Sequence, residues 1–173
     1  MHPQIEDNTM NTIISKRFFS ENVAEIVVEA PLIARSRRAG HFVIVRVDKD
    51  SERMPLTIAG ADVEKGTINL VVQQIGVSSH KLLALNEGDA IYDLVGPLGK
   101  ATHIENYGTV VCACGGVGAA PMLPIAEALK KAGNKVCILK PCYSQDNLPE
   151  KDSLLSVFNQ VTELLRSGKA ISA

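Results

Sequence analysis

The residues of this 173-residue chain whose types and spacing best suit ligand chemistry form a glycine-rich turn. Gly115, Gly116 and Gly118 follow a short apolar run, and Pro121 lies at the start of the amphipathic segment that comes next. Glycine lets the backbone approach a ligand closely and adopt positive φ angles. The free N–H groups at the start of a helix suit a pyrophosphate. The turn therefore predicts a nucleotide phosphate site, and the alternative is a tight turn that needs glycine for packing only.

The turn departs from the usual dinucleotide fingerprint in two ways. That fingerprint has Asp or Glu about 20 residues further on, where the carboxylate binds a ribose hydroxyl. This chain has Leu139 and Lys140 at the end of the next predicted strand, and Pro121 stands in place of a third glycine. An ordinary Rossmann opening is therefore not indicated.

The elements around the turn form a β-α-β unit. Residues 109–114 are a continuous apolar run, which is typical of a buried parallel strand. Apolar residues then recur at helical spacing from Met122 to Leu129 and share one helix face. Gly133-Asn134 is a helix stop signal, and residues 135–139 form the second predicted strand.

The part of the chain before this unit is strand-like. Its predicted strands are residues 12–18, 23–29, 42–47, 67–73 and 90–95. They recur at a spacing of about 8–12 residues, which favours a small antiparallel barrel closed on itself. Only one helix-sized insert is expected, at residues 78–85.

Residues 96–99 (Gly-Pro-Leu-Gly) predict a boundary loop between two domains. We expect a barrel domain at residues 10–98, an incomplete α/β unit at 99–140 and a divergent tail at 141–173. In the tail, residues 153–166 predict a helix whose apolar face includes Phe158.

Composition excludes several classes of protein. The 18 Lys and Arg against 19 Asp and Glu give a net charge of −1. A nucleic-acid binder driven by bulk charge needs a basic field that displaces counterions, so this class is not indicated. Arg35, Arg37 and Arg38 form one small basic cluster, which a solvated loop explains most simply.

Neither a membrane span nor a secretory signal is expected. The chain has no run of about 18 apolar residues, and its polar first residues include Glu6 and Asp7. A cytoplasmic protein is therefore predicted. The four cysteines are expected to be reduced structural thiols rather than metal ligands; they are Cys112, Cys114, Cys137 and Cys142.

Several stretches resemble the ferredoxin reductase superfamily, in which an antiparallel FAD-binding β-barrel precedes an α/β domain that binds NAD(P). The resemblance spans about residues 10–136, and the stretches that carry it are residues 28–34, 40–47, 53–59, 95–100 and 108–136. Within the superfamily, the chain is most similar to the small flavin-binding (alpha) subunits of NADH-dependent reduced ferredoxin:NADP oxidoreductases, also named sulfide dehydrogenase subunits. These are related to the electron-transfer subunit of dihydroorotate dehydrogenase.

The resemblance implies that the segment from Arg53 to Ile58 holds FAD. In the superfamily an Arg-x-Tyr-Ser/Thr motif neutralises the pyrophosphate with Arg, packs Tyr on the flavin ring and places the hydroxyl near the nitrogen that accepts hydride. Here Thr57 takes the hydroxyl role, Leu56 replaces the aromatic ring after Pro55, and Arg53 stands one residue early. The alternative for Thr57 is an ordinary residue on a strand surface.

A second flavin contact is implied at Gln74, Gly76, Ser78 and Ser79, where the backbone N–H groups would meet the diphosphate. The alternative for the two serines is simple helix capping. By the same resemblance, the glycines of the turn and Pro121 meet the phosphates of the nicotinamide nucleotide or pack beside the flavin.

The implied function is hydride transfer from NAD(P)H to FAD, followed by single-electron passage to an iron–sulfur centre. Because the flavin performs this chemistry, no side chain is expected to act as general acid or base. His41 and His80 are therefore expected to be structural or surface residues. The implied partners are a larger flavin and iron–sulfur subunit, in a heterodimer, and ferredoxin.

The chain also departs from this family. Full-length members carry further parallel strands, an Asp-Gly-Ser-type loop and a cysteine run that binds a 2Fe–2S cluster, and none of these occurs here. We therefore expect a truncated or frame-shifted product whose nucleotide-binding domain is incomplete. The alternatives are a flavin-binding remnant without turnover, an electron-transfer subunit of dihydroorotate dehydrogenase, and a barrel without flavin that serves as an interaction module.

Overall fold

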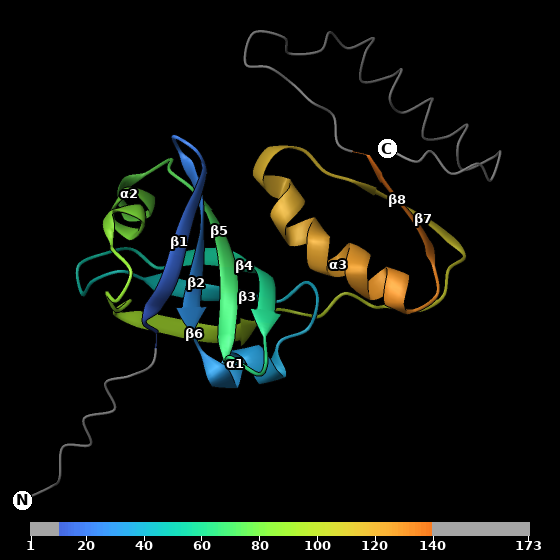
Figure 1. Cartoon of the computed structure of the whole chain (residues 1–173), viewed down its shortest axis with the longest axis horizontal. Helices are drawn as coiled ribbons and strands as arrows, with labels where there is room; N and C mark the ends of the chain where they lie inside the picture. Colours follow the sequence, from blue (N-terminus) through green and yellow to red (C-terminus); the bar gives the residue numbers. More distant parts are fainter. Residues whose placement is uncertain (1–10, 140–173) are drawn as a thin grey trace, which may run out of the picture. The chain divides into compact units, whose positions relative to one another are not determined.

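The protein is described by a computed structural model that covers residues 11–139 (Figure 1). The predictions for the tail at 141–173, including the helix at 153–166 and Cys142, lie outside the described residues. The chain divides into two compact units between Thr102 and His103. Unit 1 ends at Thr102 and unit 2 begins at His103, and each is described by itself.

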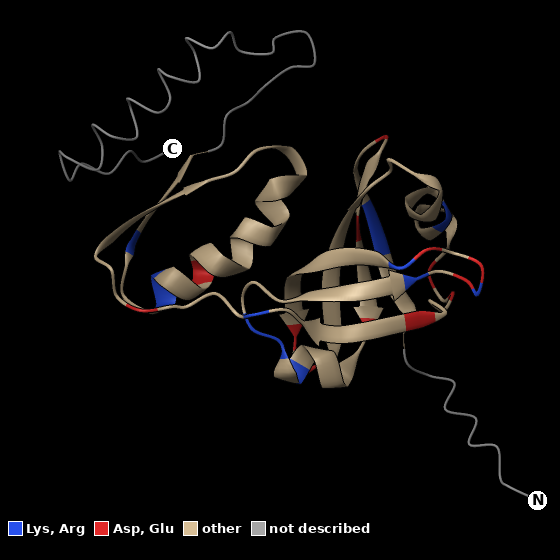
Figure 2. Ribbon diagram, turned by 180° about the vertical axis from the view of Figure 1, so that it is seen from behind, with Lys and Arg blue, Asp and Glu red and all other residues tan. Residues whose placement is uncertain are grey.

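Unit 1 is an antiparallel sheet of six strands with two short helices. Its elements are β1 (Ile13–Ser20), β2 (Val23–Glu29), α1 (Pro31–Ser36), β3 (Phe42–Arg46), β4 (Met54–Asp62), β5 (Thr67–Gln73), α2 (Val77–Ala84) and β6 (Asp93–Leu98). The strand order is β1-β2-β5-β4-β3-β6. Figure 2 shows that most charged residues of this unit lie in loops and near strand ends.

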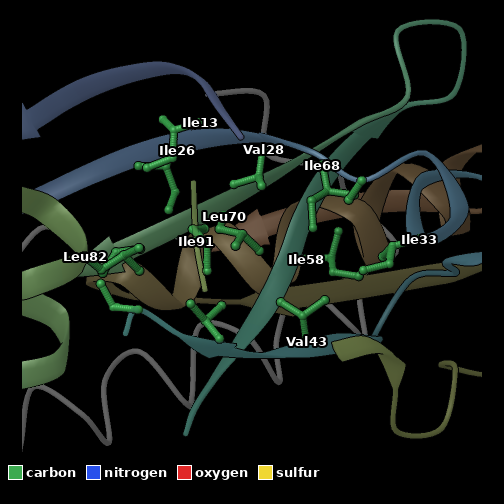
Figure 3. Packing of buried hydrophobic residues seen from close by; sticks show 14 of the residues in the cluster. Ile13, Ile26, Val28, Ile33, Val43, Ile58, Ile68, Leu70, Leu82 and Ile91 are labelled. Atoms are coloured by element: carbon green, nitrogen blue, oxygen red, sulfur yellow. The ribbon is translucent and has the colours of Figure 1, made fainter. Parts of the chain in front are cut away.

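The core of unit 1 is filled by the inward faces of its strands. Ile26 lies opposite Leu70 and Val28 opposite Ile68 in the β2–β5 ladder, and all four side chains are fully buried. Figure 3 shows them in one cluster with residues from the other strands and Leu82 of α2. Burying one such side chain stabilises the fold by about 1.5–3 kcal/mol. The packed core therefore fixes the positions of the strands and of the segments that follow their ends.

The prediction of a fully closed barrel is wrong in one respect. Among the described residues, no ladder joins the edge strands β1 and β6. An isolated bridge pairs Thr12 with Ala90, and the N–H of Ile13 donates to the carbonyl of Asp89 at 2.9 Å. These contacts involve the segment before β6, which then turns away to pair with β3. The antiparallel fold class is confirmed, but the sheet stays open.

Two elements of unit 1 differ from the sequence pattern. Helix α1 was not expected, although Pro31 suits a first helical position because its missing N–H needs no partner there. Its Ile33 and Ala34 are buried and anchor it to the core. The last strand is also shifted, since β6 covers residues 93–98 and not 90–95.

The predicted boundary loop at residues 96–99 is mostly strand. Gly96, Pro97 and Leu98 end β6, and the Gly96–Pro97 peptide bond is cis. A Cβ added at Gly96 would lie 2.6 Å from Cγ1 of Val43 on β3. The glycine is therefore explained by close packing of two strands, which a loop interpretation of Gly-Pro overlooked.

Unit 2 confirms the predicted β-α-β arrangement. Strands β7 (Thr109–Ala113) and β8 (Lys135–Leu139) are parallel. The 3-10 turn η1 (Gly116–Gly118) and helix α3 (Ala119–Lys131) connect them. Helix α3 packs Ala126 and Leu129 against Cys112 of β7.

One buried side chain, Asn134, holds the end of α3 in place. Its amide nitrogen donates to the carbonyls of Glu105 and Leu129, both at 2.8 Å, and its oxygen accepts from the N–H of Tyr107 at 2.6 Å. These bonds explain why Asn follows the stop glycine Gly133. None of the helices within residues 11–139 is long and apolar enough to cross a membrane.

Candidate functional site

The first group of predicted site residues lies on β4. Thr57 pairs with Phe42 of β3 and Leu56 pairs with Val43. Pro55 is exposed, Thr57 is half-buried, and the partly buried Leu56 packs against the core cluster. The side chain of Ile58 is 1% exposed and belongs to the core, so a ligand can meet Ile58 only through its backbone.

Arg53 precedes β4 and extends into solvent. Its guanidinium Nη2 lies 4.0 Å from Oδ2 of Asp93, and 62% of the side chain is exposed. A surface ion pair of this kind contributes about 0–1 kcal/mol. The weak pairing leaves the guanidinium available to an anionic ligand.

The second group lies at the start of α2, and the structure separates its two serines. Ser79 is buried, and its Oγ accepts from the N–H groups of Ile75 and Gly76 at 2.9 and 3.0 Å and donates to the carbonyl of Gly76 at 2.8 Å. Ser78 is half-buried and makes none of these bonds. Ser79 therefore shapes the turn, whereas Ser78 is the serine that is open to a ligand.

Gln74 and Gly76, the other two predicted residues at this turn, differ in how far protein groups already occupy them. The N–H of Gln74 donates to the carbonyl of Asn22 at 2.7 Å, and its side-chain nitrogen lies 2.7 Å from Nδ1 of His80. Gly76 is exposed, and a Cβ added to it would meet nothing within 4 Å. Gln74 is thus held by protein groups, while the backbone of Gly76 is accessible.

Strand pairing brings these two groups to the same end of the sheet. Ile58 of β4 lies opposite Leu70 of the antiparallel strand β5. The residues before Ile58 therefore extend in the same direction as those after Leu70, toward the turn at Gly76.

An ion pair that the sequence analysis did not predict connects helix α2 to the loop between β3 and β4. Nζ of Lys81 on α2 lies 2.8 Å from Oδ2 of Asp48, in the loop that leads toward Arg53. The hydrogen bond from Lys81, with a smaller one from Ser51, lowers the pKa of Asp48 to about 2. The partners are 33 residues apart, so no local spacing signal indicates the pair.

The third group is the glycine turn of unit 2. Gly116 has a φ of 52°, which favours glycine. A Cβ added at Gly116 or Gly118 would meet nothing within 4 Å among the described residues. Packing therefore does not explain glycine at these positions. Gly115 is exposed, and Pro121 lies in the first turn of α3, where a missing N–H costs little.

Three cysteines lie among the described residues of unit 2, and all three are free thiols. Cys112, Cys114 and Cys137 form no disulfide. Burial raises the pKa of the Cys112 thiol, and the neighbouring Cys114 and Cys137 raise it further, so the thiol form predominates at neutral pH. Within residues 11–139, no cluster of three His, Cys, Asp or Glu side chains could hold a metal ion.

Comparison with known proteins bears on both units. No family model matches the chain. A Thermotoga maritima protein named dihydroorotate dehydrogenase B (NAD(+)), electron transfer subunit homolog, is 38% identical over 156 residues, which is 90% of this chain and 54% of that protein. The match therefore continues beyond residue 136. The electron transfer subunit from Bacillus caldolyticus is 29% identical over 72% of the chain and 51% of its own length.

A solved structure of an NADH-dependent reduced ferredoxin-NADP oxidoreductase, described in terms of flavin-based electron bifurcation, is 38% identical to the chain. It superposes with a TM-score of 0.77 over 86% of this chain and 54% of the other. The chain is ferredoxin reductase-like. It is related to the electron transfer subunits and to the oxidoreductase named above, as its sequence predicted. Phthalate dioxygenase reductase, at 20% identity and a TM-score of 0.65, shares the fold.

The ferredoxin reductase-like chain spans about half the length of the curated relatives it matches. The matched half contains unit 1 and the glycine turn of unit 2. The candidate residues lie in two separate units, on β4 and the α2 turn of unit 1 and on the glycine turn of unit 2.

Proposed function

We propose that the chain is an electron-transfer flavoprotein subunit that binds FAD on unit 1 and receives hydride from NAD(P)H. The observation that carries the proposal is that the β4 segment and the α2 turn both extend from the same end of the β4–β5 ladder. It occurs in a chain 38% identical to an oxidoreductase described in terms of flavin-based chemistry.

The residues of unit 1 fit a flavin dinucleotide. The half-buried Ser78 offers a hydroxyl to a diphosphate. The open space over Gly76, whose own N–H donates to Ser79, lets the diphosphate approach the turn closely, and the exposed Arg53 offers a counter-charge. Thr57 supplies a hydroxyl on the strand that would support the flavin ring. When bound, FAD supplies the two-electron to one-electron chemistry, while the protein orients it and adjusts its electrostatics.

In unit 2 the glycine turn is proposed to hold the phosphates of the nicotinamide nucleotide. The positive φ of Gly116 and the open space over Gly116 and Gly118 support this assignment, because a side chain at either position would occupy the space a ligand needs. Pro121 limits the first turn of α3 without removing a needed hydrogen bond.

The partner is proposed to be a larger flavin and iron–sulfur subunit in a heterodimer, with ferredoxin as an electron carrier. The names of the relatives support a subunit role, since the Thermotoga maritima protein is named an electron transfer subunit homolog. A 2Fe–2S cluster, expected in full-length members, would be held outside the described residues or by the partner.

Two measurements on the purified full chain test the proposal. The first is visible absorbance after incubation with FAD and removal of unbound cofactor, and we expect flavin bands. The second is anaerobic addition of NADH, which should bleach those bands. If the protein is coloured but NADH does not bleach it, the chain is a flavin-binding remnant without turnover. A colourless protein that ignores FAD would refute the proposal.

A further inference from the structure

The loop between β3 and β4 carries Arg53 toward β4, and we call residues 48–53 the Arg53 loop. The loop follows the buried Val47, and it ends at Met54, which packs partly against the core. Between these two anchors every residue is half-buried or exposed, so apolar packing does not fix the loop. Figure 1 shows it beside α2. Polar contacts therefore determine where the loop lies.

Hydrogen bonds hold the first part of the Arg53 loop in one turn. Oδ1 of Asp48 accepts from the N–H of Asp50 at 2.9 Å, and the carbonyl of Asp48 accepts from the N–H of Ser51 at 3.1 Å. Arg46 of β3 donates through Nε to the carbonyl of Ser51 at 3.3 Å and through Nη2 to the carbonyl of Lys49. These bonds stabilise the turn and attach it to β3.

Lys81 attaches the same turn to α2. Its Nζ donates to Oδ2 of Asp48 at 2.8 Å and to Oγ of Ser51 at 3.4 Å. The side chains of Lys81 and Asp48 are 42% and 43% exposed, and an ion pair in such a setting adds little to the free energy of unfolding. The neighbouring Leu82 is fully buried. Lys81 therefore connects the loop to a helix that the core already holds.

This ion pair links the two segments of unit 1 that are proposed to meet the flavin diphosphate. Ser78 lies three positions before Lys81, a spacing that places both residues on one face of α2. Arg53 lies at the end of the loop on the other side of the pair, and its guanidinium has only a 4.0 Å contact with Asp93. The position of the guanidinium relative to the α2 turn therefore depends on where the loop is held.

We propose that Asp48 and Lys81 are positioning residues for the cofactor, which hold the Arg53 loop against α2 so that both segments can meet one diphosphate. This inference rests on the proposed function and adds two residues that act on the ligand only through others. A site assembled from two segments loses less conformational entropy on binding when the segments are already held together. The ion pair supplies that preorganisation.

The variant Asp48→Asn tests the proposal, because two explanations predict opposite signs. Asparagine removes a negative charge near an anionic ligand, so a direct electrostatic effect alone would lower the Kd for FAD. Loss of positioning should instead raise this Kd by about three- to tenfold, and should change the Kd for riboflavin, which has no diphosphate, by less than about twofold. Quenching of flavin fluorescence by the full chain at neutral pH and low salt measures both constants.

Further variants test whether the effect passes through the ion pair and Arg53. Lys81→Met should raise the Kd for FAD to a similar extent, and Lys81→Arg, which keeps a donor for Asp48, should restore most of the affinity. With Arg53→Gln already present, Asp48→Asn should raise the Kd by less than about twofold, because the guanidinium that the pair positions is absent. The matched control Asp62→Asn removes the surface pair with Lys65 at the other end of β4, and should leave both Kd values unchanged.

Four results would overturn the inference. They are an unchanged or lower Kd for FAD in Asp48→Asn, an equal rise in the Kd for FAD and for riboflavin, an undiminished effect of Asp48→Asn alongside Arg53→Gln, and an equal effect of Asp62→Asn. If FAD binds with the same Kd before and after Asp48→Asn, the proposed function stands and only the positioning role is lost. Absence of FAD binding by the unmodified chain would refute the proposed function, and the positioning role with it.

Discussion

The two units hold their candidate ligand residues by different means. Unit 1 relies on a large core, in which residues from strands β1 to β5 and both helices are buried together and the partly buried Leu94 of β6 packs against them. Within its described residues, unit 2 has a much smaller hydrophobic cluster of Cys112, Ala126 and Leu129, with a few partly buried neighbours. In unit 1 the two candidate segments, residues 53–58 and 74–79, are 16 positions apart and reach the same end of the sheet through strand register, whereas in unit 2 the candidates all lie within residues 115–121. Flavin binding should therefore depend on global stability, and nucleotide binding on local backbone geometry.

The largest expected effect is on the core of unit 1. Leu70→Ala removes a fully buried side chain at the centre of the sheet. It should destabilise unit 1 by about 2–5 kcal/mol and abolish flavin retention at moderate temperature. Chemical denaturation followed by flavin release measures both. Leu129→Ala in unit 2 is the control, and if it releases flavin equally, the units are not independent in the way proposed.

The next largest effect is expected from Ser79→Ala. The substitution leaves the N–H groups of Ile75 and Gly76 without their hydroxyl acceptor, which costs about 0.5–1.5 kcal/mol because both residues are exposed and water can bind in its place. FAD affinity should fall clearly more than riboflavin affinity, because riboflavin has no diphosphate. Ser79→Thr keeps a hydroxyl and should recover part of the loss. An equal fall for both ligands would indicate general unfolding.

Gly116→Ala tests the local geometry of unit 2. A side chain at a φ of 52° costs about 1–2 kcal/mol, so the turn should lose its shape and the KM for NADH should rise. FAD binding should not change. Gly118→Ala is the matched control for stability, because its φ is −64° and it has open space around it. If Gly118→Ala destabilises unit 2 as much as Gly116→Ala, backbone strain is not the cause.

The smallest expected effect is a loss of fold stability at acidic pH. Since Lys81 lowers the pKa of Asp48 from 3.8 to about 2, the carboxylate stabilises the fold when it is ionised. This stabilisation is present above pH 3.8 and is lost as the pH falls toward about 2. Denaturation curves of the unmodified chain and Asp48→Asn should differ slightly at neutral pH and converge at the acid end. A difference that grows as the pH falls would contradict the assignment.

Local sequence patterns were sufficient for part of the fold. The apolar run at 109–113, the glycine turn and the periodic helix after it all form as expected, because each depends on neighbouring residues. Helix α1 was missed because a helix of six residues shows little periodicity. The bounds of β6 were misplaced because Gly96 is typical of a loop in the sequence, whereas in the fold it is a strand residue that packs closely against Val43. The β4 segment was recognised from family resemblance, not from alternation.

For the candidate site, residue types and order were enough to predict which segments offer a phosphate-binding backbone and a hydroxyl. They were not enough to separate Ser78 from Ser79, because both suit a helix start and only the folded turn buries one of them. The Asp48–Lys81 pair and the open edge between β1 and β6 likewise depend on how distant residues come together. The preference of a segment for helix, strand or turn depends on neighbouring residues, so the sequence predicts it. Strand register and side-chain burial depend on contacts that form only when the whole sheet folds.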